Sequence, residues 1–287
     1  MIAIIGIVLL LVVVFVPYVL SNGSMAVIFH ALIIEGPTIL GAGVASLLIG
    51  NSMTVLKQLA GGLKSVFSGA KWKPEDYVNL LSLLFQITKT MKAKGVVALE
   101  SHIENPSESS IFSAYPRILG DHFAIDFICD TIRMMTMNLE DPHQVEDAME
   151  KQLEKHHHES LMAGHAVVSL SDALPALGIV AAVLGVIKTM GSITEPPAVL
   201  GEMIGGALVG TFLGVLLAYG LVGPFGHRIT QIVDEESTVY RIIQSVLISH
   251  LHGNAAQVSV EIGRTNVPTE HQPTFQDLEE ALSTVTA

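Results

Sequence analysis

The sequence predicts an all-α integral membrane protein, with four transmembrane helices arranged as two hairpins and a helical cytoplasmic domain between the second and third helices. Of its 287 residues, 50% are hydrophobic and only 15% are charged, whereas a soluble domain usually carries about 25% charged residues. The missing charge is concentrated in four stretches long enough to cross a bilayer, and most Lys and Arg residues lie in one loop between two of them. These observations exclude most soluble folds.

Each predicted transmembrane helix has about the 20 apolar residues needed to span the hydrocarbon core. The four spans cover residues 1–20, 31–50, 166–190 and 201–223. Short loops at 21–30 and 191–200 join the spans in pairs, so that residues 1–50 form the first hairpin and residues 166–223 the second. The N-terminus lacks the basic region and cleavage site of a signal peptide, and we interpret its apolar stretch as a span.

The distribution of Lys and Arg predicts the orientation. Residues 51–165 hold 11 of these 15 residues, residues 224–287 hold 3, and the two short loops hold none. Because Lys and Arg are enriched in cytoplasmic loops, we expect a cytoplasmic domain at 51–165, a cytoplasmic C-terminal helix and tail at 224–287, and both termini in the cytoplasm. The net charge of −12 argues against nucleic acid as a partner. The single cysteine, Cys129, excludes an internal disulfide.

The large loop carries helical start and stop signals. Pro74 opens a run with apolar residues at helical spacing, and Gly95 ends it. We expect further helices from Arg117 to Asn138 and from His143 to His158, with a turn at 104–110. The tail continues the fourth span as a helix to His252 and is then interrupted by Gly and Pro.

Small residues recur in the third and fourth spans. They are Gly178, Ala181, Ala182 and Gly185 in the third span, and Gly206, Gly210, Gly214 and Ala218 in the fourth. Small residues four apart let helix backbones approach closely in lipid. Such faces can pack the two helices of one hairpin, or they can pack identical subunits or a foreign helix inside a ring.

Two prolines and a threonine are candidates for function in the same spans. Pro175 and Pro224 lie at the cytoplasmic ends of the third and fourth spans, and in an α-helix each would leave unpaired the carbonyl four residues earlier, that of Ser171 or Gly220. Each proline can also be an ordinary kink. Thr211 is the most conspicuous hydroxyl of the fourth span, and it can simply bond back to its own helix.

The membrane interior of these two helices has no Asp, Glu, His, Lys or Arg. None occurs between Leu174 and Lys188 or between Met203 and Gly223, while Asp172 and Glu35 lie near opposite ends of the spans. An ion pathway normally needs an ionisable group at depth. If the chain helps ions to cross, a partner must therefore supply the central carboxylate.

The remaining polar clusters have no motif of an enzyme or a metal site. His156, His157 and His158 are consecutive and point in different directions around a helix, so we interpret them as a solvated helix end and expect no metal and no cofactor. Nucleophile elbows, phosphate loops and zinc-protease motifs are missing. Lys92 and Glu100 belong to a group of opposite charges around Gly95, which is either a solvated surface or a patch that orients a partner.

Three strings resemble the flagellar stator family of MotA. They are LESHIENPSESSIFSAYPRIL at 99–119, LPALGIVAAVLGVIKTMGS at 174–192 and GTFLGVLLAYGLVGP at 210–224. The resemblance extends over nearly the whole chain. It implies a bacterial inner-membrane protein that forms a pentameric ring around a MotB dimer, surrounded by lipid. MotB brings the ion-carrying aspartate, and ion flow through the complex drives the rotor protein FliG.

The resemblance also implies roles for individual residues. It places Pro175 and Pro224 on the family's functional prolines, Thr211 on its channel-facing threonine, and Lys92 and Glu100 on its rotor-contacting positions. Lys92 departs from the arginine often found there, which keeps the charge but loses the planar fork.

Two further positions bear on the choice of ion. Sodium-driven relatives have threonines where this chain has Ala182 and Gly210, so the resemblance implies transport of H⁺ rather than Na⁺. Alternatives are an ExbB- or TolQ-like energiser of envelope transport, a stand-alone secondary transporter and a structural scaffold; the four spans argue against the first.

Overall fold

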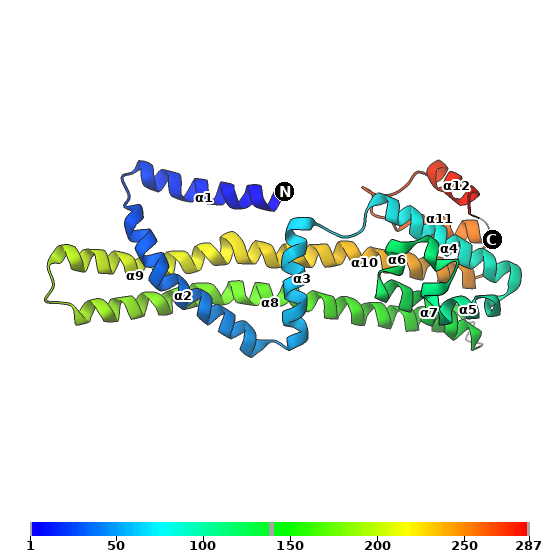
Figure 1. The fold of residues 1–287 in the computed structure, drawn as a ribbon, viewed down its shortest axis with the longest axis horizontal. Coiled ribbons are helices and arrows are strands. Elements are labelled where there is room, and N and C mark those ends of the chain that lie inside the picture. Colours follow the sequence, from blue (N-terminus) through cyan, green and yellow to red (C-terminus); the bar gives the residue numbers. More distant parts are fainter. Residues whose placement is uncertain (1, 138–140, 286–287) are drawn as a thin grey trace. The chain divides into compact units, whose positions relative to one another are not determined.

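In the computed structural model all regular secondary structure is helical over the residues that it describes, 2–137 and 141–285 (Figure 1). Four helices in this part of the chain are long and apolar enough to cross a membrane: Ile2–Leu20, Met25–Gly50, Pro142–Gly191 and Pro197–Leu251. The predicted all-α class and the apolar character of these segments are confirmed. The described chain forms two compact units, residues 1–69 with 160–233 and residues 70–159 with 234–287.

The first unit contains the apolar helices. Helix α1 (Ile2–Leu20) and helix α2 (Met25–Gly50) are joined by a turn at 21–24, where Asn22 adopts a positive φ of 61°. The predicted loop at 21–30 is therefore too long, because α2 begins six residues before residue 31. Helix α3 (Met53–Ser68), which the sequence analysis did not predict, begins at Ser52, whose hydroxyl accepts a hydrogen bond from the Val55 amide.

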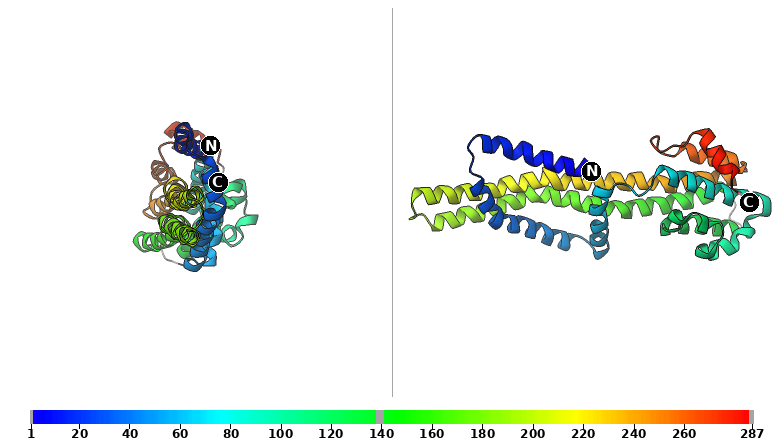
Figure 2. Two further views of the ribbon diagram at one scale, coloured as in Figure 1. Left: turned by 90° about the vertical axis from the view of Figure 1, so that its left-hand side faces the viewer. Right: turned by 45° about the horizontal axis from the view of Figure 1, so that its top comes forward.

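Helix α8 (Pro142–Gly191) and helix α9 (Pro197–Leu217) form the centre of this unit. They run antiparallel, side by side, from the turn that joins them (Figures 1 and 2). After α9 the chain makes one π-helical segment, η4 (Ala218–Val222), and continues as α10 (Gly223–Leu251). Apolar side chains of α2, α8 and α9 share one buried cluster that includes Ile39, Leu174 and Leu213.

The second unit has a conventional hydrophobic core. Helix α4 (Pro74–Lys94) has Pro74 in its first turn and ends at Gly95, whose φ is 82°, as predicted. Short helices follow: η1 (Val96–Leu99), α5 (Glu100–Glu104), η2 (Pro106–Glu108), η3 (Phe112–Ala114) and α6 (Pro116–Leu119). Then comes α7 (His122–Thr136), and its buried face packs with α4 and α10 around Leu84, Ile128 and Ile243.

Two sequence-based helix boundaries in this unit are wrong, whereas the predicted helix end at His252 agrees with the end of α10 at Leu251 to within one residue. The helix expected from Arg117 to Asn138 is interrupted at Gly120, because Asp121 accepts a hydrogen bond from the Ala124 amide and starts α7 anew; residue 138 lies outside the described residues. The segment from His143 to His158 is not a separate helix but the beginning of α8, which continues to Gly191. The tail beyond Leu251 contains two more helices, α11 (Ala256–Thr265) and α12 (Phe275–Ser283).

Candidate functional site

Helices α8 and α9 touch through their backbones. A Cβ atom added to Gly178 would lie 2.8 Å from the carbonyl oxygen of Gly210, and one added to Gly214 would lie 2.7 Å from the carbonyl oxygen of Leu174. A Cβ on Gly185 would lie 2.7 Å from that of Ala207. Only glycine leaves room for this approach, as expected for small-residue helix pairs in lipid.

Gly206 differs from the other predicted packing glycines. A Cβ added to Gly206 would meet no atom within 4 Å, so this residue does not bring α8 and α9 together. It lies instead on a polar pocket of about 220 Å³ at the turn end of the helix pair, which is lined among others by Glu35, Lys188 and Glu202. Glu35 is only 8% exposed. The sequence analysis had noted Glu35 without predicting that it faces Lys188.

The candidate ion-path residues lie along the same pair. Pro175, Ala182 and Thr211 are half-buried, and Gly210 is buried, with its Cβ position 3.3 Å from the Ala182 nitrogen. Among the described residues, no Asp, Glu, His, Lys or Arg occurs between Leu174 and Lys188 or between Met203 and Gly223. These parts of α8 and α9 therefore form an uncharged surface that has no carboxylate or histidine to carry a proton.

Pro224 follows the π-helical turn of η4. The Gly223 amide donates to the carbonyl of Ala218, five residues earlier, instead of following the α-helical pattern. The Ser171 hydroxyl of α8 donates to the same carbonyl at 2.8 Å. Proline has no N–H, and a wider turn accommodates this missing donor. Sequence reasoning singled out the Ser171 carbonyl because of Pro175 and missed the role of its hydroxyl.

The candidate rotor-contact residues lie in the second unit. Lys92 is in the last turn of α4, exposed, with its Nζ 3.4 Å from the carbonyl oxygen of Gly253. Glu100 is the first residue of α5 and is also exposed. Two side chains of opposite charge are thus presented on either side of the Gly95 turn, on helices whose other faces are buried in the core.

A polar network fixes the start of α4 and α7. Lys71 forms an ion pair with Asp121 at 2.6 Å, and the Tyr240 hydroxyl donates to the same carboxylate at 3.1 Å. Burial alone would raise the pKa of Asp121, but the hydrogen bond from Lys71, the Ala124 amide, the Lys71 charge and the Tyr240 hydroxyl together lower it below its ordinary value.

His156 belongs to this network. The prediction that His156 to His158 form a solvated helix end is wrong for His156, whose ring stacks on Phe123 with a centroid distance of 3.5 Å. Burial lowers the pKa of His156, while the nearby Asp121 charge opposes the shift. His157 lies 3.3 Å from Asp234, and only His158 is exposed. The three rings point to different surroundings because consecutive residues are about 100° apart on a helix.

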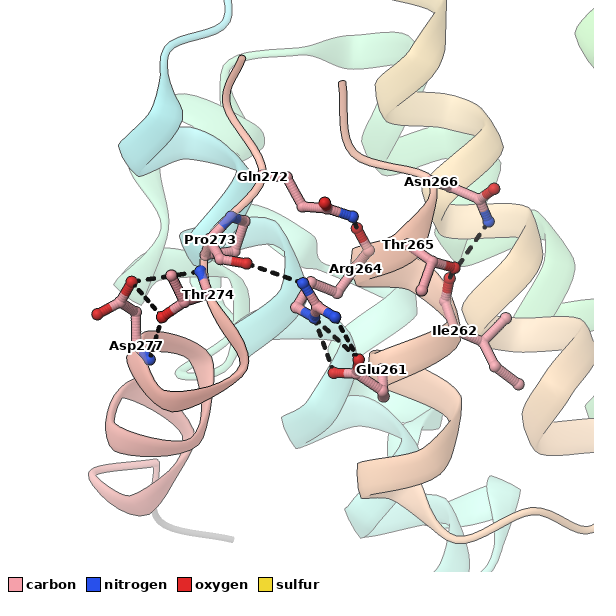
Figure 3. Close-up of polar contacts among 9 residues, drawn as sticks. All are labelled: Glu261, Ile262, Arg264, Thr265, Asn266, Gln272, Pro273, Thr274 and Asp277. Carbon is pink, nitrogen blue, oxygen red and sulfur yellow. Dashed lines mark hydrogen bonds and ion pairs between the residues drawn. The ribbon is translucent and has the colours of Figure 1, made fainter. Parts of the chain in front are cut away.

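Helices α11 and α12 of the tail pack against α4, and a clasp of polar contacts around Arg264 joins α11 to the segment before α12 (Figure 3). The Arg264 guanidinium donates to Glu261 at 2.6–2.9 Å and to the carbonyl oxygen of Pro273 at 3.0 Å, and Gln272 donates to the Arg264 carbonyl. Thr274 then caps α12, whose Leu278 is buried in the core. The C-terminal segment is thus part of the unit that presents Lys92 and Glu100.

Two family models match successive parts of the chain, and each match includes residues of both structural units. Residues 4–95 match the family described as motility protein A N-terminal, and residues 122–242 match the MotA/TolQ/ExbB proton channel family. The chain is 36% identical over 285 residues to motility protein A of Escherichia coli (strain K12), covering 99% of this chain and 96% of that protein. It is 33% identical over 278 residues to chemotaxis protein LafT of Vibrio parahaemolyticus, covering 97% of each.

Solved structures show the same fold. The C. jejuni MotAB structure aligns with a TM-score of 0.72 at 18% identity, covering 95% of this chain and 98% of that one. The flagellar MotAB stator complex from Bacillus subtilis aligns with a TM-score of 0.68 at 21% identity, covering 97% and 98%.

The apolar helices and the uncharged helix pair define a multi-pass membrane subunit of the proton channel class. The chain belongs to the motility protein A family. The predicted family is confirmed, and because its relatives are motility and channel proteins, so is the prediction that the chain is not an enzyme.

Proposed function

We propose that this chain works as a flagellar stator subunit in the bacterial inner membrane, where it forms a ring, as a pentamer, around a MotB dimer. The observation that supports this function best is the closely packed, apolar part of the α8–α9 pair, which has no carboxylate between Leu174 and Lys188 or between Met203 and Gly223. A proton path through such a wall needs an ionisable group from elsewhere. The MotB helix would supply it.

The orientation follows from the charges. We place both termini and the second unit in the cytoplasm, because 14 of the 15 Lys and Arg residues lie in segments 51–165 and 224–287. The polar pocket around Glu35 and Lys188 then lies at the opposite membrane face, where a cation would enter before it reaches the uncharged helices.

The transported ion is H⁺ in this proposal. Na⁺ is held by oxygen ligands, and neither Ala182 nor Gly210 offers one from a side chain. The packing also disfavours a threonine at 210, since a Cβ there would lie 3.3 Å from the Ala182 nitrogen and 3.4 Å from the Ala181 Cβ. We expect swimming to continue when external sodium is replaced by potassium and to stop with a protonophore. Loss of swimming without sodium, at an intact proton-motive force, would refute this choice.

Torque transfer would use Lys92 and Glu100 against FliG. Both side chains are exposed and sit on helices anchored in the core, so the contact is a charged one on a rigid support. We expect Lys92→Glu to impair swimming and a reversed charge on FliG to restore part of it. Lys155→Glu, the same change at another exposed position, serves as the control and should swim normally.

Deletion of the chain tests the function as a whole. Cells without it should build filaments that do not rotate. Filament rotation in such cells would contradict the proposed function of the chain as a stator subunit. Normal swimming of the Lys92→Glu variant would contradict only the proposed contact with the rotor.

A further inference from the structure

A large groove in the first unit is not part of the ion path described above. Its volume is about 1170 Å³, which is larger than the roughly 300–1,000 Å³ typical of pockets for small molecules. One wall is α1, and the other walls come from the end of α3 and from η4 and the start of α10. Leu10 of α1 packs where a Cβ on Gly220 would lie, at 2.7 Å, so the two walls meet at this glycine.

The lining is apolar along most of its length and polar at one end. The α1 wall consists of aliphatic residues and Gly6, and Tyr219, Pro224 and Phe225 face it. Arg228 is the only charged residue among the described residues of the lining, and Gln231 and Ser68 are its polar neighbours there. Arg228 also donates to Gln231 at 3.4 Å, which holds the two side chains at the same end.

The walls belong to surfaces that lipid would cover. No residue in the apolar window of α1 is buried within the chain, and Tyr219 is 67% exposed. Helix α3, which closes the polar end, carries Lys57 and Lys64, both exposed, and has no Asp or Glu. A helix with an apolar face and lysines on the other is typical of the membrane interface and is attracted by anionic lipids.

We propose that this groove binds a membrane phospholipid with an anionic head group, its acyl chains lying against α1 and its phosphate beside Arg228. The guanidinium fork suits a phosphate group, and the apolar length suits chains that a soluble anion lacks. The bound lipid would contact Pro224 and η4, and would thereby support the turn that interrupts the fourth span. The site shares Pro224 with the candidate functional residues of the fourth span, but its other walls are α1 and α3, and the α8–α9 glycine contact does not contribute to it.

Native mass spectrometry of the purified complex of this chain with its MotB partner, in detergent with added dioleoyl phosphatidylglycerol or dioleoyl phosphatidylcholine, tests the site. We expect the wild-type complex to retain phosphatidylglycerol in preference to phosphatidylcholine. Arg228→Gln should reduce that preference about fivefold, the effect of one cationic residue near an anionic lipid. Arg241→Gln, an exposed arginine further along α10, is the matched control and should leave it unchanged.

The apolar part of the groove is tested by a substitution that narrows it. A Cβ on Gly6 meets no atom within 4 Å, so Gly6→Leu places a side chain in open space without a clash. This variant should retain less of both lipids than the wild type, whereas Gly41→Leu, whose Cβ position is equally open and lies outside the groove, should retain as much as the wild type. Competition by inorganic phosphate at millimolar concentration would show that the site binds a free anion and would overturn the lipid assignment. Equal binding of the two lipids by the wild type, or lipid retention by Gly6→Leu at the wild-type level, would overturn it as well.

Discussion

Replacing Gly214 with alanine should force α8 and α9 apart. The added Cβ would lie 2.7 Å from the Leu174 carbonyl oxygen and 2.9 Å from the Gly178 Cα, both backbone atoms that cannot rotate away. Since ordinary contact begins at 3.4 Å, the helices must separate by about 0.7 Å at this point. Overpacking of this kind costs roughly 1–3 kcal/mol, and each kcal/mol corresponds to about 2–4 °C in Tm for a chain of 150–250 residues.

The assay is thermal unfolding of the purified protein in detergent, followed by circular dichroism at 222 nm, with swimming speed measured in parallel. Gly206→Ala is the matched control, because it lies on the same helix and its Cβ position is open. We expect Gly214→Ala to lower Tm by several degrees and to slow swimming, while Gly206→Ala has the wild-type Tm. Equal Tm values for the two variants would refute the reasoning that this backbone contact holds the pair together.

Three further perturbations test the network around these helices. Ser171→Ala removes the second donor to the Ala218 carbonyl; we expect a loss of about 1 kcal/mol in unfolding free energy and slower swimming, with rescue by Ser171→Thr. Arg264→Gln breaks the clasp to Glu261 and Pro273, so hydrogen exchange in residues 272–283 should accelerate at least tenfold while exchange in α7 stays the same. His156→Phe should flatten the fall of Tm below about pH 6.5.

The sign of the pH effect follows from the lowered pKa of His156. The unfolded chain binds a proton more readily than the folded one, so this stability is present above the unfolded pKa of about 6.5 and is lost as pH falls toward the folded value. His158→Phe, at an exposed ring of the same helix, should leave the pH dependence of Tm unchanged. An unaltered pH dependence of Tm in His156→Phe would show that the stacked ring is not the source of this dependence.

The other two variants have refuting outcomes of their own. A wild-type swimming speed of Ser171→Ala would contradict the role assigned to the Ser171 hydroxyl, and unaltered hydrogen exchange in the tail of Arg264→Gln would contradict the role assigned to Arg264.

The sequence could predict the apolar helices and α4 because their signals are local. The span predicted at residues 1–20 agrees with α1 at Ile2–Leu20. Pro74 marks the start of α4 because its φ is restricted to helical values, and Gly95 marks the end because glycine can adopt a positive φ. The change near residue 165 misled the division of α8, because the pattern there shifts from amphipathic to apolar. This shift reports the surroundings of the helix and not its end. Gly164 lies at this point, but α8 continues through it, and a Cβ there would lie 2.6 Å from Thr230 Oγ1.

Other features depend on tertiary contacts that have no local signature. The Ser171 hydroxyl meets the Ala218 carbonyl 47 residues away, and the stacking of Phe123 on His156 joins two helices. Helix α12 was not predicted either, although its start has a local signature: Thr274 followed three residues later by Asp277 is a helix-capping signal. The groove beside α1 requires three separate segments to come together, so no pattern in one of them could predict it.

The position of η4 indicates where the fourth span can bend. Close backbone contacts lie on both sides of it: Gly214 meets α8 before the segment, and after it a Cβ on Gly226 would lie 3.0 Å from the Val168 nitrogen. Between these contacts, the five residues Ala218–Val222 have π-helical hydrogen bonds and precede a proline that cannot donate one. A helix that is held at two points and has a π-helical turn between them bends most readily at that turn. Ser171 is the one α8 hydroxyl among the described residues that bonds to this segment, and its loss should therefore alter the bend more than the packing.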